Sequence, residues 1–145
     1  MPSDNFFELI PAGMSDTGLC GNLNTTITCL FRELLGRANF GGGLLKTQKT
    51  DMQRFLLLSD EHSNCFREFP TDLKSRPILS IFDEVGLDPE SDVPLDEQEP
   101  SPLPDRKALD DIVFDAIELT GEERKEVYRA VCRLVYARIS RANSV

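Results

Sequence analysis

A helix that leads directly into a glycine-rich loop is the feature that most constrains this chain. Apolar residues recur at helical spacing between residues 22 and 35, and they predict one buried stripe: Ile27, Leu30, Phe31, Leu34 and Leu35. Asn22 or Asn24 can cap the start of this helix, and Gly36 suits a left-handed cap at its end. The loop that follows, residues 39–43, carries almost no side chains. Such a loop either brings the backbone close to a polyanion or simply turns the chain.

Length and composition are those of one globular domain. The 145 residues are 40% hydrophobic and 28% charged, which is enough for a modest core. No apolar run approaches the roughly 20 residues that span a bilayer, and the N-terminus lacks a signal-peptide pattern. The four cysteines are scattered, and the single histidine, His62, has no ligand-like neighbours. We therefore expect a cytoplasmic protein with free thiols, no metal, no cofactor and no membrane contact.

The net charge of −9 is concentrated in the middle of the chain. Residues 1–58 carry five basic and five acidic groups, and residues 105–145 carry eight of each. Residues 59–104 carry three basic and twelve acidic groups, so the whole acidic excess lies there. The two flanking segments are neutral and can present local basic faces to a polyanion.

Outside this helix and loop, the N-terminal half carries weaker signals. Residues 5–10 predict a short edge strand, and residues 12–21 predict a loop. Thr50-Asp51 is expected to cap one short helical turn. The apolar run 55–58 fits either a buried strand or the end of a helix, because periodicity does not separate the two.

The middle segment predicts one short helix and a linker. Residues 75–85 show a helical stripe, with Pro77 at an early position and Gly86 at the end. The stripe consists of Ile78, Ile81, Phe82 and Val85. Before it, Phe66 and Phe69 are expected to dock on the core. Residues 88–104 are acidic and proline-rich, so we expect them to run extended over the surface.

Two helices are predicted at the C-terminus. Asp105 can cap the first, and Thr120 with Glu123 forms a capping box that starts the second. A turn this short predicts an αα-hairpin. The apolar faces are Leu109, Ile112, Val113, Ala116 and Ile117, then Val127, Val131, Leu134, Val135 and Ile139. The predicted fold class is therefore α+β, mainly helical, with short strands and a C-terminal αα-hairpin.

Catalytic motifs are absent from the sequence. The chain has no P-loop, no H-E-x-x-H and no G-x-S-x-G, and the glycine loop follows a helix where a cofactor loop would follow a strand. Asp110, Asp111 and Asp115 are interpreted as a solvated helix face in preference to a metal or acid–base site. Cys29 lies beside the apolar stripe and is interpreted as a small core residue.

Basic residues gather in two places. Arg37, Lys46, Lys49 and Arg54 surround the glycine loop. Lys125, Arg129 and Arg133 recur every four residues and form a basic ridge on the final helix. The ridge is either a solvated face, balanced by acidic neighbours, or a surface that meets phosphates. The solvated face is the favoured reading.

These residues resemble the C-terminal part of adenine-specific DNA methyltransferases of type II restriction–modification systems. The pattern near the end of their target-recognition region matches Leu23-Asn24-Thr25-Thr26, Arg37-Ala38-Asn39-Phe40-Gly41-Gly42-Gly43, Leu45-Lys46 and Thr50-Asp51-Met52. Residues 105–145 resemble the extreme C-terminus of the same enzymes, and the resemblance covers most of residues 4–145. The family's Asn-Pro-Pro-Tyr motif, which positions the flipped adenine, is missing here.

The resemblance implies a non-catalytic DNA-recognition fragment. Residues 1–58 would be a remnant of the target-recognition module, 59–104 an acidic connecting segment and 105–145 the C-terminal hairpin. Duplex DNA is the expected partner, and a separate methyltransferase or endonuclease chain is a further one. The expected DNA-binding residues are Arg37, Asn39, Gly41, Gly43, Lys46 and Lys49. Asn39 either reads an adenine edge or closes the turn, and the turn is favoured.

The alternative is a helical docking or oligomerisation module that never touches DNA. The acidic net charge favours it, and so does the apolar face that a piece of a larger enzyme would expose. In that case the chain would associate through the stripe of residues 27–35 or that of residues 127–139.

Overall fold

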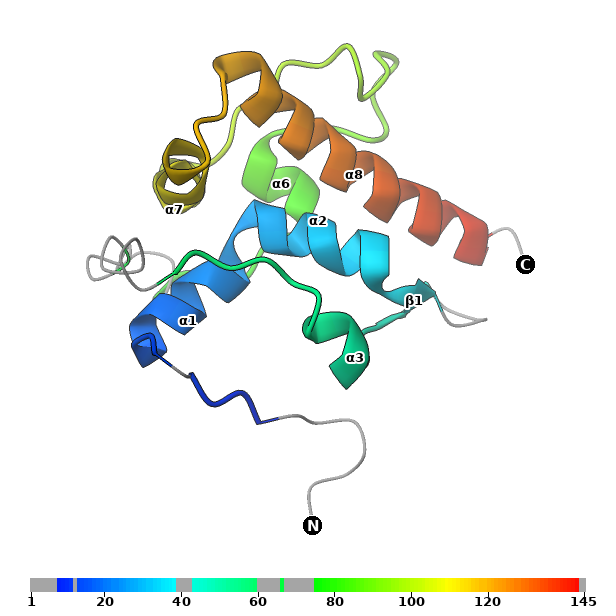
Figure 1. The fold of residues 1–145 in the computed structure, drawn as a ribbon. Helices are drawn as coiled ribbons and strands as arrows, with labels where there is room; N and C mark the ends of the chain where they lie inside the picture. Colours follow the sequence, from blue (N-terminus) through cyan, green and yellow to red (C-terminus); the bar gives the residue numbers. More distant parts are fainter. Residues whose placement is uncertain (1–7, 12, 39–42, 60–65, 67–74, 144–145) are drawn as a thin grey trace.

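The computed structural model describes residues 8–11, 13–38, 43–59, 66 and 75–143 (Figure 1). Within them lie the helices α1 (Asp16–Asn24), α2 (Thr26–Leu35), α3 (Lys49–Met52), α6 (Ile81–Val85), α7 (Pro104–Ala116) and α8 (Gly121–Asn143). The strands β1 (Arg37–Ala38) and β2 (Leu45–Lys46) form one antiparallel pair. The predicted class, a mainly helical α+β fold, is confirmed. None of these helices is long and apolar enough to cross a membrane.

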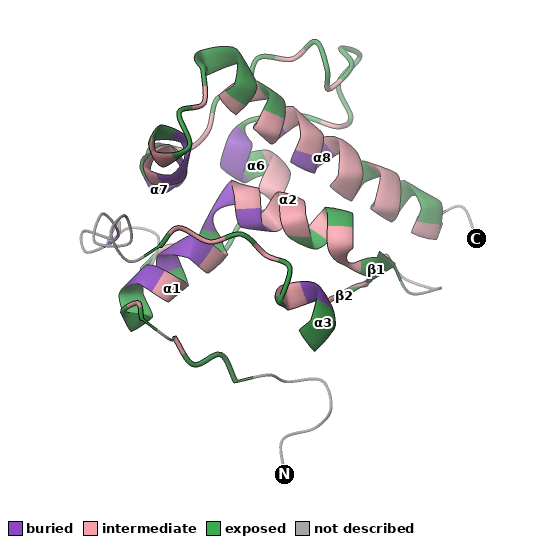
Figure 2. Ribbon diagram, in the orientation of Figure 1, coloured by how far each residue is buried: buried purple, intermediate pink, exposed green. Residues whose placement is uncertain are grey.

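The packing of α2 on α8 organises the core. Ile27, Cys29 and Leu30 of α2 meet a buried cluster that includes Val131 and Cys132 of α8 (Figure 2). The apolar stripes of the two helices therefore face each other within one chain, whereas the docking alternative predicted association with another chain through either stripe. Burying these stripes in one core is a main source of the fold's stability.

The first helical region differs from its prediction. Residues 16–21, predicted as part of a loop, belong to α1, and the helix predicted over residues 22–35 is interrupted at Thr25, after which α2 starts. Thr25, and neither Asn22 nor Asn24, is the N-cap of α2, and its Oγ1 accepts a hydrogen bond from the N–H of Thr28 at 3.3 Å. Ser15 caps α1 in the same way. The sequence reading missed both caps because glycines inside the first helix look like breaks.

Gly21 shows why such glycines occur there. Phe66 is fully buried, as predicted, and a Cβ on Gly21 would lie 2.4 Å from its ring. Phe69 lies outside the described residues.

Gly36 ends α2 with φ −70° and ψ 159°, so the predicted left-handed cap is wrong. A side chain at Gly36 would collide with the carbonyl oxygen of Arg32, 2.5 Å from its Cβ. Close approach, and not a positive φ, requires glycine at this position.

Three short-range predictions in the N-terminal half are wrong. Residues 8–10 form no strand and are exposed, while the rest of the predicted strand lies outside the described residues. Residues 55–58 are neither strand nor helix, and the N–H of Leu58 donates to Asn22 Oδ1 at 2.8 Å. The short turn α3 exists, but its N-cap is Gln48, whose N–H donates to Asp51 Oδ2 at 2.9 Å. The Asn22 side chain thus accepts the Leu58 hydrogen bond that the backbone of a neighbouring strand would accept in a sheet.

The helix predicted over 75–85 is shorter than expected. It begins at Ile81, because Ser80 caps it, and Pro77 lies outside it. Ile78, predicted on its buried face, is 97% exposed. The other three apolar residues of that stripe do pack on the core. Gly86 ends the helix in the left-handed region with φ +67°, which confirms the predicted stop.

Two C-terminal helices form where they were predicted, joined by a short turn, but they do not pack along each other as an antiparallel hairpin would. The N–H of Thr120 donates to Glu123 Oε2 at 2.8 Å, and the N–H of Glu123 donates to Thr120 Oγ1 at 3.4 Å. This capping box starts α8 after a short turn. The first helix begins at Pro104 with Leu103 as its cap, so the predicted cap at Asp105 is wrong. In Figure 1 α7 is seen nearly end-on while α8 lies across the view and packs mainly on α2.

The acidic segment 88–104 lies on the surface, as predicted, but it folds into turns between residues 89 and 98, so its predicted extended form is wrong, and it is tied to the core. The N–H of Ser101 donates to the carbonyl of Val85 at 3.0 Å, and Leu95 packs against the buried cluster. The chain was predicted to divide at residues 58 and 104, and this division stays a prediction.

Candidate nucleic-acid interface

The β1–β2 pair brings two of the predicted DNA-binding residues together. Arg37 and Lys46 lie directly opposite each other in the register, and Lys49 follows at the start of α3. All three side chains are exposed. Asn39 and Gly41, the other polar and glycine positions of the loop, lie outside the described residues.

Gly43 plays a packing role in this loop. Its φ of +64° favours glycine, and a Cβ there would lie 3.3 Å from Ala142 Cβ on α8. The Arg138 guanidinium donates to the Gly43 carbonyl. Gly43 therefore anchors the start of β2 against α8. Its predicted contact with DNA stays a prediction.

Two acidic residues in this region are already engaged. Glu33 on α2 accepts from Arg138 Nε at 2.9 Å and from its Nη2 at 2.7 Å. This bidentate pair raises the pKa of Arg138, chiefly through the Glu33 hydrogen bonds. Asp51 is buried and accepts the hydrogen bond that starts α3. Neither carboxylate neutralises the exposed cations nearby.

The basic side chains between residues 25 and 59 form no ion pair with the part of the chain that the structure describes. The stretch contains five basic and two acidic residues. The basic ones are Arg32, Arg37, Lys46, Lys49 and Arg54, and each is exposed. Among the residues that the structure describes, no ion pair involves any of the five. Residues 25–59 therefore carry a local excess of positive charge on a chain of net charge −9.

The basic ridge on α8 is the opposite case. Lys125 Nζ lies 2.6 Å from Glu99 and 2.9 Å from Glu122, and Arg129 lies 3.6 Å from the same Glu99. Arg133 pairs with Asp96 and Glu126. Two of these partners belong to the acidic segment, which folds across the ridge. The favoured interpretation of the ridge, a face balanced by carboxylates, agrees with these contacts.

One of the three aspartates on α7 is not solvated, so that prediction is wrong for Asp110. Asp110 is 0% exposed and accepts hydrogen bonds from Thr26 N–H at 2.7 Å and Thr26 Oγ1 at 2.6 Å. Its carboxylate therefore serves the N-terminus of α2, where the helix dipole favours negative charge. Burial raises its pKa to about 6, and the Thr26 hydrogen bonds offset this only in part. Burial and the nearby Asp110 also raise the pKa of Tyr128.

The other two aspartates form ion pairs with α8. Arg124 lies 3.0 Å from Asp111 and 2.6 Å from Asp115, and its guanidinium stacks over the ring of Phe114 at 5.7 Å. Within the described residues no group of three possible metal ligands was found. The cluster is therefore a structural contact between α7 and α8.

A buried ionic network joins α6 to α7. Arg76 binds Glu84 with both terminal nitrogens, at 2.6 and 2.7 Å, and Asp105 through Nε at 2.5 Å. Arg106 reaches Glu84 at 3.1 Å and also donates to the carbonyl of Asn24. Burial acts to raise the pKa of Glu84, but the hydrogen bonds from both arginines outweigh it, so the pKa is lowered. Asp105, which lies in the first turn of α7, takes part in this network.

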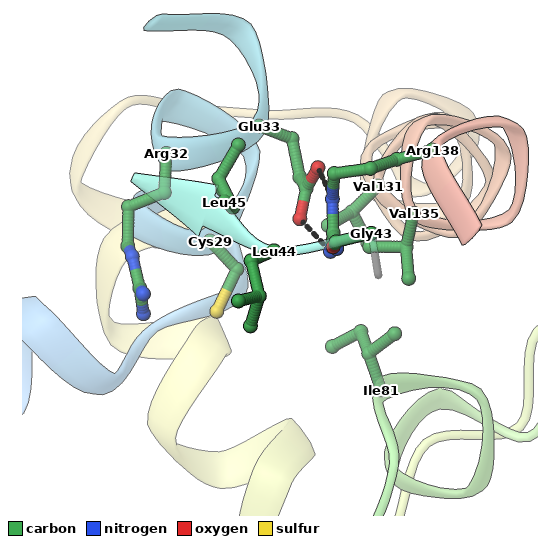
Figure 3. A pocket seen from close by; sticks show the side chains of 10 residues that line it. All are labelled: Cys29, Arg32, Glu33, Gly43, Leu44, Leu45, Ile81, Val131, Val135 and Arg138. Atoms are coloured by element: carbon green, nitrogen blue, oxygen red, sulfur yellow. Dashed lines mark hydrogen bonds and ion pairs between the residues drawn. The ribbon is translucent and has the colours of Figure 1, made fainter. Parts of the chain in front are cut away.

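Burial makes two of the described cysteine thiols harder to ionise. Burial raises the pKa of Cys29 and raises that of Cys132 to about 12. Cys29 lines an open cleft of about 350 Å³ between α2, β2, α6 and α8 (Figure 3). Figure 3 shows Glu33 and Arg138 pointing toward each other above this cleft, with Arg32 on its far side from Ile81.

Comparisons with known proteins give no further guide. No family model, no curated protein and no solved structure matches this chain. The resemblance to methyltransferases therefore rests on the sequence motifs alone, and functional inference rests on the chemistry of the surface.

Proposed function

We propose that this protein binds duplex DNA through its phosphates, using the face formed by α2, β1, β2 and α3. Its role would be that of a non-catalytic recognition fragment similar to the C-terminal part of a type II restriction–modification methyltransferase. The observation that carries the proposal is the set of five exposed cations in residues 25–59, which have no ionic partner among the described residues. A DNA-binding role of this kind belongs in the cytoplasm, which the free thiols also favour.

The argument depends on the difference between free and paired cations. A free lysine or arginine gains a phosphate contact and releases counterions without breaking an existing ion pair. A paired residue such as Lys125 or Arg129 must first give up its carboxylate partner. Arg37 and Lys46 are held side by side by the strand pairing, so they can contact phosphates together.

A second candidate function is protein docking. The open cleft of Figure 3 favours it, because Leu44, Leu45 and Ile81 present apolar surface beside exposed charge. The partner in that case would be a separate methyltransferase or endonuclease chain.

A matched pair of double variants tests the DNA proposal. Arg37→Gln with Lys46→Gln removes two free cations, while Lys125→Gln with Arg129→Gln removes two paired ones. Affinity for a labelled duplex is measured by fluorescence anisotropy at several salt concentrations. We expect the first pair to weaken binding and to flatten the log–log salt slope by about two units, because each lost phosphate contact removes about 0.9.

The control pair changes net charge equally and should leave the salt slope near that of the wild type. Equal effects of both pairs would mean that net charge alone governs binding. An unchanged slope in the first pair would remove Arg37 and Lys46 from the interface.

A further inference from the structure

Two clefts of about 350 Å³ each adjoin on the surface that α2 and β2 share. Arg32 and Leu45 line both, so they form the divide between them. The first cleft is the one in Figure 3. The second lies toward α1 and α3 and includes Leu23, Met52 and Phe55. Together they make a two-part groove with apolar walls and Arg32 in its middle.

The charges in this groove indicate which charge its occupant carries. Glu33 and Arg138 neutralise each other through a bidentate contact. Arg32 is the remaining charged lining residue, and it forms no ion pair with any residue that the structure describes. An occupant that fits therefore carries a carboxylate close to large apolar side chains.

One segment of this same chain has that chemistry. Glu8, Leu9 and Ile10 lie in an extended stretch that precedes α1, at the dark blue end of the described chain in Figure 1. Leu9 is 44% exposed and Ile10 is 78% exposed. The segment is therefore not seated in the groove of its own chain, and its apolar side chains remain available for burial elsewhere.

We propose that residues 8–11 of one copy occupy the groove of a second copy. Glu8 meets Arg32 on the divide, and Leu9 and Ile10 enter the clefts beside it. The exchange is reciprocal, so it closes into a two-fold dimer with two identical groove contacts. This inference goes beyond the proposed function, and Arg32 is the one free cation that the dimer would take from the DNA interface.

Oligomeric state in solution, without DNA, tests the proposal. Sedimentation velocity over a concentration series should show a monomer–dimer equilibrium for the wild type. Ile10→Asp should weaken the dimer by about tenfold or more, since it removes a large apolar side chain from the contact. Val93→Asp is the matched control: it makes the same change at an exposed apolar position on the acidic segment, and we expect no effect. A wild type that stays monomeric at every concentration, or equal weakening by both variants, would overturn the proposal.

A charge exchange tests the Glu8–Arg32 contact directly. Glu8→Arg and Arg32→Glu should each weaken the dimer, and the double variant should restore it because the pair is re-formed with reversed sign. A double variant weaker than both single variants would overturn the assignment of this pair.

Binding of a synthetic peptide with the sequence of residues 4–11 provides a second readout. The peptide should dissociate the wild-type dimer, and a dimer that persists at saturating peptide would contradict the proposal. The DNA test uses Arg37 and Lys46, so the two proposals fail separately.

Discussion

Replacing Asp110 with asparagine should change how the stability of the protein depends on pH. The Asp110 carboxyl is fully buried against Thr26, and its folded pKa of about 6 lies above its ordinary value of 3.8. An acid whose pKa rises on folding binds more protons in the folded state than in the unfolded state between these two values. Its contribution therefore stabilises the protein at low pH and is lost as pH rises through about 6.

The magnitude follows from the size of this shift. Two pKa units correspond to about 3 kcal/mol over the whole window. Between pH 7 and pH 5, linkage predicts that this group raises the unfolding free energy by about 1 kcal/mol. Glu84 and Asp105 act in the opposite direction, because their folded pKa values are lowered and their stabilisation is lost on acidification. That loss occurs mainly below about pH 4.5, so it contributes little between pH 5 and pH 7, and comparison with Asp110→Asn separates the Asp110 contribution from those of the other titrating groups.

Urea unfolding followed by circular dichroism at pH 5, 6 and 7 measures the effect. The wild type should gain about 1 kcal/mol from pH 7 to pH 5, and Asp110→Asn should lose this gain because its side chain does not titrate. Asp115→Asn, at a largely exposed position, should keep the wild-type slope. A slope in Asp110→Asn equal to that of the wild type would refute the reasoning, since every other titrating group is retained.

Other expectations concern the buried contacts and are checked by the same unfolding assay. Glu84→Gln should cost about 3 kcal/mol, because it leaves the buried Arg106 without a full counter-charge. A loss under about 1 kcal/mol would mean that solvent replaces the carboxylate. Gly21→Ala should cost about 1–3 kcal/mol, because its Cβ would lie 2.4 Å from the ring of Phe66. Gly121→Ala meets no atom within 4 Å and should be close to neutral, so equal losses at the two glycines would contradict the packing argument.

Local signals in the sequence predicted the elements that depend on local interactions. The capping box at Thr120 and the stop at Gly86 were both found, because the residues that make them lie within a few positions of each other. The break at Thr25 was missed because two apolar periods join across it without a proline. Its signal was the Thr25-Thr26 pair, since a threonine before a helical stripe is a preferred cap.

The remaining features depend on contacts that a local pattern does not contain. Asp110 is buried because its carboxylate accepts hydrogen bonds from Thr26 at the start of α2, which lies 84 residues earlier in the chain. Arg37 and Lys46 were placed near one loop from their positions alone, and the structure puts them opposite each other. That the ridge at Lys125 is neutralised depends on how the acidic segment folds across α8. Neither the free nor the paired state of a cation is visible in the sequence.

The salt dependence of DNA binding by the wild-type chain tests the central claim most directly. A labelled duplex of random sequence is titrated by fluorescence anisotropy from low to physiological salt. Four phosphate contacts, one for each free cation in residues 25–59 apart from the groove residue Arg32, predict a slope of about −3.6 in log affinity against log salt. Steep loss of affinity near that slope would support the free cations as the interface. No binding at low salt, or binding that does not change with salt, would contradict it.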